Sequence, residues 1–166
     1  SRVAVGVAQG LGWSLDLPVY PFCSLEAQAR SVPAKVGDRI LSTIDAQIGQ
    51  VYWSWSERVP GGIRLLTEPT ISTVKDIRSP MGDALADWVA DDVVIAGDAS
   101  DAVVQCHAVF AHSGSDSAAR PRPSQCALSY IDNPAPEQLI TAQALEPRYV
   151  QQDIGWKKLS EQGNKH

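Results

Sequence analysis

The sequence contains few cysteines and no long uninterrupted apolar run. Its 166 residues include three cysteines, Cys23, Cys106 and Cys126, and no two of them have the C-x-x-C spacing. This pattern argues against a disulfide framework and against a zinc knuckle, and it is typical of reduced thiols. No apolar stretch approaches the roughly 20 residues that a membrane-spanning helix needs. We therefore expect a cytoplasmic protein that makes no contact with a membrane.

The motifs of several common enzyme classes are also missing. Neither H-E-x-x-H nor G-x-S-x-G occurs, so metalloproteases and serine hydrolases with these signatures are not indicated. The nucleotide-binding patterns G-x-G-x-x-G and G-x-x-x-x-G-K-[ST] are absent too. His107 and His112 are five positions apart, which places them on different faces of a helix and matches no zinc spacing. We expect no catalytic residue and no metal ligand in this chain.

Charged residues are sparse, and the balance between them is mildly acidic. They make up 20% of the chain, the formal net charge is −5, and 44% of the residues are hydrophobic. Such a chain lacks the broad basic surface by which proteins bind nucleic acid directly. Any contact with RNA would need a partner that supplies positive charge. The apolar content suffices for the core of one domain or of two small lobes.

Residues 1–15 predict a helix that is apolar on nearly every side. Gly6 and Gly10 lie about one turn apart, so another helix or a sheet can approach this helix closely. Each glycine lowers the intrinsic helix propensity by about 1 kcal/mol, so packing must hold the helix. Its candidate contact residues are Val3, Ala4, Val7, Ala8 and Leu11. The surface that they contact is either the chain's own sheet or another protein.

The segment from Arg39 to Glu57 predicts a β-hairpin that organises the rest of the chain. Val51, Trp53 and Trp55 share one face of its second strand, because side chains alternate along a strand. Two of the five tryptophans therefore lie in this hairpin. We expect much of the buried aromatic surface to gather around it.

The turn of this hairpin is a candidate loop on the nucleotide side of a cleft. Asp45 begins the turn, Gln47 lies within it and Gly49 ends it. An acid at a strand end can hold a metal or a nucleotide, but more often it accepts a hydrogen bond from a backbone N–H of the turn. A core hairpin with an ordinary turn is therefore the alternative.

Shorter patterns predict the remaining elements. Ser79-Pro80 favours the start of a helix, with Ser24 as the N-cap of another. The linker at 33–38 is the candidate boundary between two lobes. The expected elements are helices over 25–32, 81–89, 124–131 and 137–144, strands over 63–67 and 92–96, and loops over 68–72 and 112–123.

Three segments resemble a known protein family. They are V-A-V-G-V-A-Q-G-L at 3–11, I-D-A-Q-I-G-Q-V-Y-W at 44–53 and E-P-R-Y-V-Q-Q-D-I-G-W-K-K-L at 146–159. In this order they are similar to the bacterial TsaB family, also called YeaZ, of tRNA threonylcarbamoyladenosine biosynthesis. Residues 78–135 carry little of the resemblance. Gln47 and Gln50 depart from it, since the family commonly has a basic residue and a glutamate there.

The resemblance implies an α/β fold with a mixed sheet, of the actin/Hsp70-like ATPase superfamily with RNase-H-like lobes. On this basis we expect residues 1–36 to be the remnant of an incomplete first lobe. Residues 37–166 would form the second lobe with a C-terminal tail. Family members carry a D-T-A/S strand and a G-P-G-S-F-T-G-x-R loop that this sequence lacks. We therefore expect an N-terminal part to be absent.

The resemblance also implies a function. The chain would be a non-catalytic partner subunit of the complex that modifies the adenosine next to the tRNA anticodon. It would support a TsaD-like paralogue together with a TsaE-like ATPase, with ATP and metal in those partners and tRNA reached only through the complex. Two alternatives stay open: a nucleotide-binding or M22 glycoprotease-like enzyme that uses the inter-lobe cleft, and a homodimer of this chain.

Overall fold

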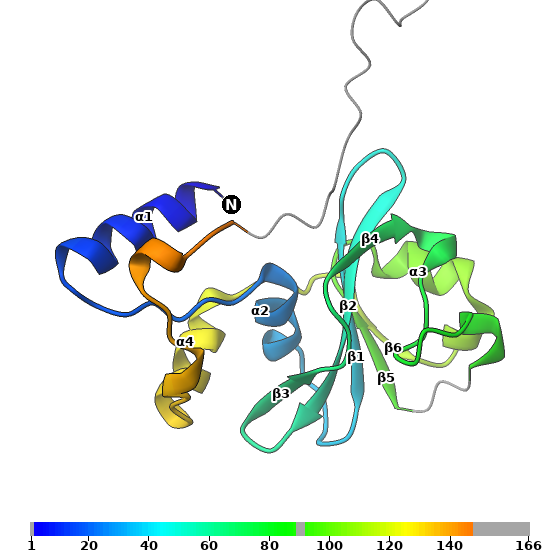
Figure 1. The fold of residues 1–166 in the computed structure, drawn as a ribbon. Coiled ribbons are helices and arrows are strands. Elements are labelled where there is room, and N and C mark those ends of the chain that lie inside the picture. Colours follow the sequence, from blue (N-terminus) through cyan, green and yellow to red (C-terminus); the bar gives the residue numbers. More distant parts are fainter. Residues whose placement is uncertain (1, 89–91, 148–166) are drawn as a thin grey trace, which may run out of the picture.

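A mixed sheet forms the centre of the fold in the computed structural model, which describes residues 2–88 and 92–147 (Figure 1). Strand β1 lies between an antiparallel neighbour, β2, and a parallel neighbour, β5. The order across the described sheet is β3-β2-β1-β5-β6, and β4 pairs with the other end of β2. The strands are β1 (Arg39–Asp45), β2 (Gln50–Val59), β3 (Gly62–Leu65), β4 (Thr70–Thr73), β5 (Val93–Ala96) and β6 (Gly114–Asp116).

The predicted hairpin is confirmed as β1 and β2, with Asp45 opposite Val51 and Thr43 opposite Trp53. The apolar face of β2 lies in the larger of two cores, where Trp55 is fully buried. The ring of Trp55 lies 5.1 Å from that of Trp88 and 6.2 Å from that of Phe110, centre to centre. Trp88 and Phe110 thus gather against the buried face of this strand, to which its alternate side chains point.

Helices cover both faces of the sheet (Figure 1). α3 (Ser100–Cys106) lies on the face of the aromatic core. α2 (Ser24–Ser31) lies on the opposite face, over a smaller core that includes Ala29, Val32 and Ile40. α4 (Pro123–Asp132) packs outside α2. Because α2 packs on this sheet, contacts cross the predicted lobe boundary at residue 36, and that division stays a prediction.

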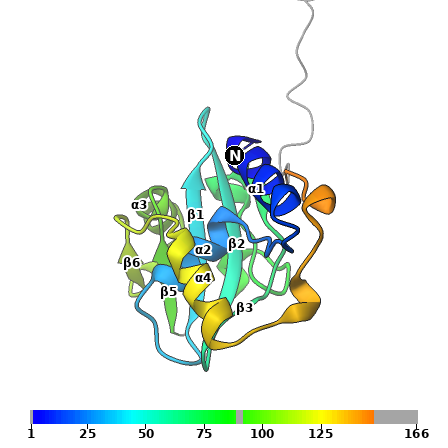
Figure 2. The same ribbon diagram turned by 90° about the vertical axis from the view of Figure 1, so that its left-hand side faces the viewer.

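α1 (Arg2–Ser14) lies to one side of the sheet, beside the last described segment of the chain (Figures 1 and 2). Just after α1, Val19 pairs with Ile140 of that segment through two backbone hydrogen bonds of 2.8 and 2.9 Å. The side-chain amide of Gln9 donates to the carbonyl of Leu145 over 2.7 Å. The predicted N-terminal helix is therefore confirmed, and the segment at 140–147 holds it.

Two predicted helices are wrong. Residues 81–88 hold only a short 3-10 turn, because Ser79 accepts hydrogen bonds from the N–H groups of Met81 and Asp83 and the chain turns back at Gly82, where φ is +91°. Val89, the predicted end of that helix, lies outside the described residues. The helix expected over 137–144 is replaced by two 3-10 turns, since Ile140 between them pairs with Val19.

Several smaller predictions also need correction. β4 and β6 occupy segments that were expected to be loops. The N-cap of α2 is Cys23 rather than Ser24, with its sulfur accepting the N–H of Glu26 over 3.4 Å. The 3-10 turns of the described residues are η1 (Val74–Asp76), η2 (Leu85–Asp87), η3 (Ala108–Phe110), η4 (Pro136–Gln138) and η5 (Ala142–Ala144).

Candidate partner-binding surface and cleft

One side of α1 presents apolar side chains to solvent. Val3, Val7 and Leu11 follow one another at a spacing of four residues and are 76%, 57% and 58% exposed. Residues at this spacing lie on one helix face. Ala4 next to them is exposed as well, whereas Ala8 is half-buried. The structure thus brings four of the five candidate contact residues together on an open surface, here called the α1 face.

The backbone of α1 is also accessible on this side. A Cβ atom added at Gly6 or Gly10 would meet no atom within 4 Å, so the helix surface is open there. The opposite side of α1 packs on the chain itself, where a Cβ at Gly12 would lie 2.9 Å from that of Ala142. Contiguous apolar surface of this kind is typical of sites where proteins meet.

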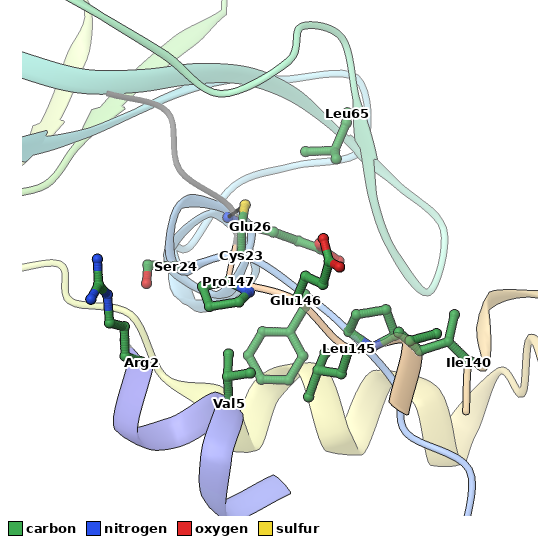
Figure 3. A pocket seen from close by; sticks show the side chains of 13 residues that line it. Arg2, Val5, Cys23, Ser24, Glu26, Leu65, Ile140, Leu145, Glu146 and Pro147 are labelled. Carbon is green, nitrogen blue, oxygen red and sulfur yellow. Dashed lines mark hydrogen bonds between the residues drawn. The ribbon is translucent and has the colours of Figure 1, made fainter. Parts of the chain in front are cut away.

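A cleft of about 850 Å³ separates α1 from the sheet layer (Figure 3). Val5 and Leu145 line one side of it, and Leu65 at the end of β3 lies across from them. Its volume falls within the range of small-molecule sites. The lining comes from four separate segments of the chain: α1, residues 21–26, β3 and residues 140–147.

The carboxylate of Glu26, which lines the cleft, is paired within the chain. Glu26 forms an ion pair with Arg30, with 3.0 Å between Oε1 and Nη2. Arg30 also donates to Ser129 on α4 over 2.6 Å. Among the described residues that line the cleft there is no histidine. A carboxylate already paired with a guanidinium is a poor general base.

Cys126 lies beneath this region, on the side of α4 that faces α2, and it is fully buried. Burial, with a further contribution from the charge of Glu26, raises the pKa of its thiol to about 12. A thiol with this pKa stays protonated at neutral pH and does not act as a nucleophile. In the described part of the chain, no group of three or more His, Cys, Asp or Glu residues is arranged to hold a metal ion.

The candidate loop of the hairpin lies away from the cleft. Asp45 accepts the N–H of Gln47 through Oδ1, and its own N–H donates to Oδ1 of Asp98, each over 2.8 Å. Asp45 therefore accepts a backbone hydrogen bond within the turn, as the alternative of a core hairpin with an ordinary turn predicts. Neither Asp45, Gln47 nor Gly49 is among the residues that line the cleft. A nucleotide-side role for these three residues stays a prediction.

The cleft residues escaped the sequence analysis for a physical reason. Phe22 and Leu145 lie close to the pairing of Val19 with Ile140, more than a hundred positions away, and Leu65 is placed by the pairing of β3 with β2. No local pattern predicts the pairing of Val19 with Ile140. The residues of the α1 face, in contrast, all lie within one helical segment, so they could be named in advance.

Comparison with known proteins places the chain in a family. The family model of TsaD, described as tRNA N6-adenosine threonylcarbamoyltransferase, matches residues 2–152. The chain belongs to the TsaD family. Within it, the protein named tRNA threonylcarbamoyladenosine biosynthesis protein TsaB from Escherichia coli K12 is 27% identical over 169 residues, which cover 95% of this chain and 68% of that protein. The protein of the same name from Haemophilus influenzae is 39% identical over 54 residues, 32% of this chain and 23% of that protein.

Solved structures of YeaZ and of a YeaZ-like protein share the fold. YeaZ from Pseudomonas aeruginosa superposes with a TM-score of 0.72 at 23% identity, covering 89% of this chain and 67% of its own. A second structure, of a protein with similarity to peptidase YEAZ from the same organism, gives a TM-score of 0.68 at 21% identity, covering 90% of this chain and 67% of its own. These findings confirm the resemblance to TsaB and YeaZ and the actin/Hsp70-like, RNase-H-like fold.

The extent of these matches is limited. The chain spans about two thirds of the length of the E. coli TsaB protein and of the two solved structures. Of the three segments that carried the resemblance, those at 3–11 and 44–53 lie in α1 and in the β1–β2 hairpin. Most of the third, at 146–159, lies outside the described residues. Within the described residues, no helix combines the length and the apolar character needed to cross a bilayer.

Proposed function

We propose that this chain is a non-catalytic partner subunit in the synthesis of tRNA threonylcarbamoyladenosine, and that it supports a TsaD-like paralogue through the α1 face. The names of its TsaB relatives support the process. The observation that carries the mode of action is the exposed apolar row of Val3, Val7 and Leu11. Ala4 and Ala8 border this row and would contact the same partner.

The energetics favour burial of this row by another protein. Covering a valine or leucine side chain contributes about 1.5–3 kcal/mol when it is fully buried. α1 is already held from behind by Gln9 and by the close packing of Gly12, so it is presented without a further ordering cost. A rigid helix with an uncovered apolar face suits docking against a helix or groove of a partner.

The chemistry of the complex is proposed to reside in the other subunits. The paired state of Glu26 and the protonated thiol of Cys126 support a chain without its own catalytic group. ATP and metal would be bound by the TsaD-like paralogue and a TsaE-like ATPase. With a net charge of −5, this chain would reach tRNA only through its partners. Its free cysteines agree with a cytoplasmic complex.

The test is calorimetric titration of the chain with the purified TsaD-like paralogue of the same organism. Val7→Asp places a charge in the centre of the α1 face, and we expect it to weaken binding by about tenfold or more. Leu128→Asp is the matched control, because Leu128 is 52% exposed on α4, away from that face. The control should bind like the unaltered chain. Equal binding by Val7→Asp would show that α1 is not the interface.

An enzyme that uses the cleft is the second candidate, favoured by a cavity of about 850 Å³, large enough for a nucleotide-sized ligand. Titration of the isolated chain with ATP and Mg²⁺ separates the two functions. The partner-subunit proposal expects neither heat of binding nor hydrolysis. Light scattering of the chain alone tests the homodimer, since self-association through the α1 face would be abolished by the same Val7→Asp change.

A further inference from the structure

The tip of the β1–β2 hairpin presents one large apolar side chain to solvent. Ile48 is 95% exposed, more than any other large hydrophobic residue of the described chain. The hairpin end that carries it, drawn in cyan, projects beyond the rest of the sheet (Figure 1). Ile48 therefore contributes no burial to the fold of its own chain.

The backbone of Ile48 is also in an unfavourable conformation. Its φ is +54°, between Gln47 at +67° and Gly49 at +73°. Left-handed backbone costs free energy for every residue except glycine, and for a β-branched residue it is a genuine outlier. Asparagine or glycine suits such a turn better. Neither burial nor backbone preference in this chain accounts for an isoleucine at position 48.

Hydrogen bonds fix the base of the tip. The N–H of Ala46 donates to the carbonyl of Gln50, and the N–H of Gln50 donates to the carbonyl of Gln47, each over 3.0 Å. Asp45 adds its bonds to Gln47 and Asp98. The tip is thus held in one shape, and a side chain presented in this way loses little freedom on binding.

Two exposed carboxylates flank the tip. Asp45 and Asp98 are both open to solvent, and the segment from 45 to 50 contains no lysine or arginine. A surface that meets this tip without electrostatic cost must supply positive charge around an apolar centre. We propose that Ile48 is an anchor residue that inserts into an apolar socket of a partner protein, with basic side chains on the socket rim facing Asp45 and Asp98.

This second contact rests on the proposed function, because the TsaD-like paralogue is the protein in which the socket is sought. It uses a different element from the α1 face, so the two contacts can be tested separately. Position 48 offers a clean variant, since Ile48→Asn removes the anchor and relieves the backbone. The variant should bind the paralogue on the order of tenfold more weakly, while its urea midpoint rises. Loss of binding together with a gain of stability is not the signature of a damaged fold.

The control for the anchor is Met81→Asn, since Met81 is 80% exposed in a loop outside the tip. It should leave binding unchanged. The rim is tested with Asp98→Asn, which keeps an oxygen to accept the N–H of Asp45 but removes the charge. Association of this variant with the paralogue should be slower and less sensitive to salt, because a rim charge acts mainly on the association rate.

The outcomes separate this proposal from the proposed function. If Val7→Asp abolishes binding and Ile48→Asn does not change it, the anchor is overturned and the partner-subunit role stands. If the unaltered chain does not bind the paralogue, the partner-subunit role and the anchor are both wrong. A lower urea midpoint for Ile48→Asn would overturn the anchor, since Ile48 would then stabilise its own fold. Unchanged salt dependence for Asp98→Asn would overturn the basic rim.

Discussion

The backbone N–H of Asp45 donates a hydrogen bond of 2.8 Å to the Oδ1 atom of Asp98. Asp45 ends β1 and Asp98 follows β5, two parallel neighbours whose last paired residues are Ser42 and Ala96. The bond therefore joins the two strands beyond the point where their ladder stops. It ties the base of the hairpin tip to the turn that leads into α3.

Removal of this bond should weaken the fold by a small, measurable amount. Asp98→Ala leaves the N–H of Asp45 to water, and we expect the free energy of unfolding to fall by about 0.5–1.5 kcal/mol in urea denaturation. Asp98→Asn retains an oxygen acceptor and should lose less. Identical stability of Asp98→Ala and the unaltered chain would mean that the bond contributes nothing.

A glycine next to Asp98 should be irreplaceable for reasons of space. A Cβ at Gly97 would lie 1.7 Å from the carbonyl oxygen of Thr43 and 2.4 Å from Nε2 of Gln28, and its φ is +111°. The amide of Gln28 is buried there and donates to the carbonyls of Thr43 and Ala96. Gly97→Ala must displace both the Thr43 carbonyl and the Gln28 amide. We therefore expect the free energy of unfolding to fall by more than about 4 kcal/mol, or the chain to fail to fold.

Gly37→Ala is the matched control for that prediction. Gly37 has a similar φ of +97°, but a Cβ there would meet no atom within 4 Å. This variant carries only the backbone cost, about 1–2 kcal/mol. The difference between the two urea curves measures the steric contact alone. Equal losses at both positions would show that conformation, and not close approach, decides the cost at Gly97.

Two glycines of α1 should respond in opposite directions to the same change. A Cβ at Gly12 would lie 2.9 Å from the Cβ of Ala142 and 3.1 Å from the carbonyl oxygen of Leu17, so Gly12→Ala should push α1 off its support and lower the melting temperature. Gly10→Ala meets no atom within 4 Å and should stabilise the helix by about 1 kcal/mol. A stabilising effect of both changes would mean that α1 is not packed through Gly12.

Much of the fold could be predicted where the pattern is local and strong. The alternation of Val51, Trp53 and Trp55 predicts the hairpin and its buried face, and the small apolar residues of 1–15 predict α1. The continuous apolar run at 93–96 predicts the buried strand β5, because a short run of this kind is typical of a strand covered on both faces. In each case the signal lies within one short segment of the chain.

The failures at 70–73 and 137–144 come from pairing with a distant segment, whereas the helix expected over 81–89 fails locally, because the chain turns back at Ser79 and Gly82. Ile140 was assigned to a helix, but its hydrogen bonds to Val19 hold it extended. β4 joins the sheet because β2 is long enough to pair with β3 at one end and with β4 at the other. The cleft depends on the same long-range pairing, so its lining could not be predicted, whereas the α1 face could.

The cysteines differ in how far solvent reaches their thiols. At pH 8, Cys106, which is exposed, should react readily with a thiol reagent, whereas Cys126 should react only after unfolding, because it is fully buried and its pKa is raised to about 12. Counting the labelled cysteines by mass spectrometry, with and without urea, checks this order. Labelling of Cys126 at the rate of Cys106 in the folded chain would contradict its burial under α2.

The raised pKa of Cys126 also sets the direction of an alkaline effect. The unfolded thiol loses its proton near pH 8.5–9, whereas the folded one holds it to about pH 12, so the folded state binds more protons between these values. The stabilising contribution is complete below about pH 8.5 and falls by about 1.5 kcal/mol by pH 10. Cys126→Ala should lower stability at pH 8 but show a shallower decline toward pH 10. The pKa of Tyr20 is raised too, chiefly by burial, then by the charge of Glu26, with a smaller contribution from Cys126. Parallel pH profiles for Cys126→Ala and the unaltered chain would place the titration elsewhere.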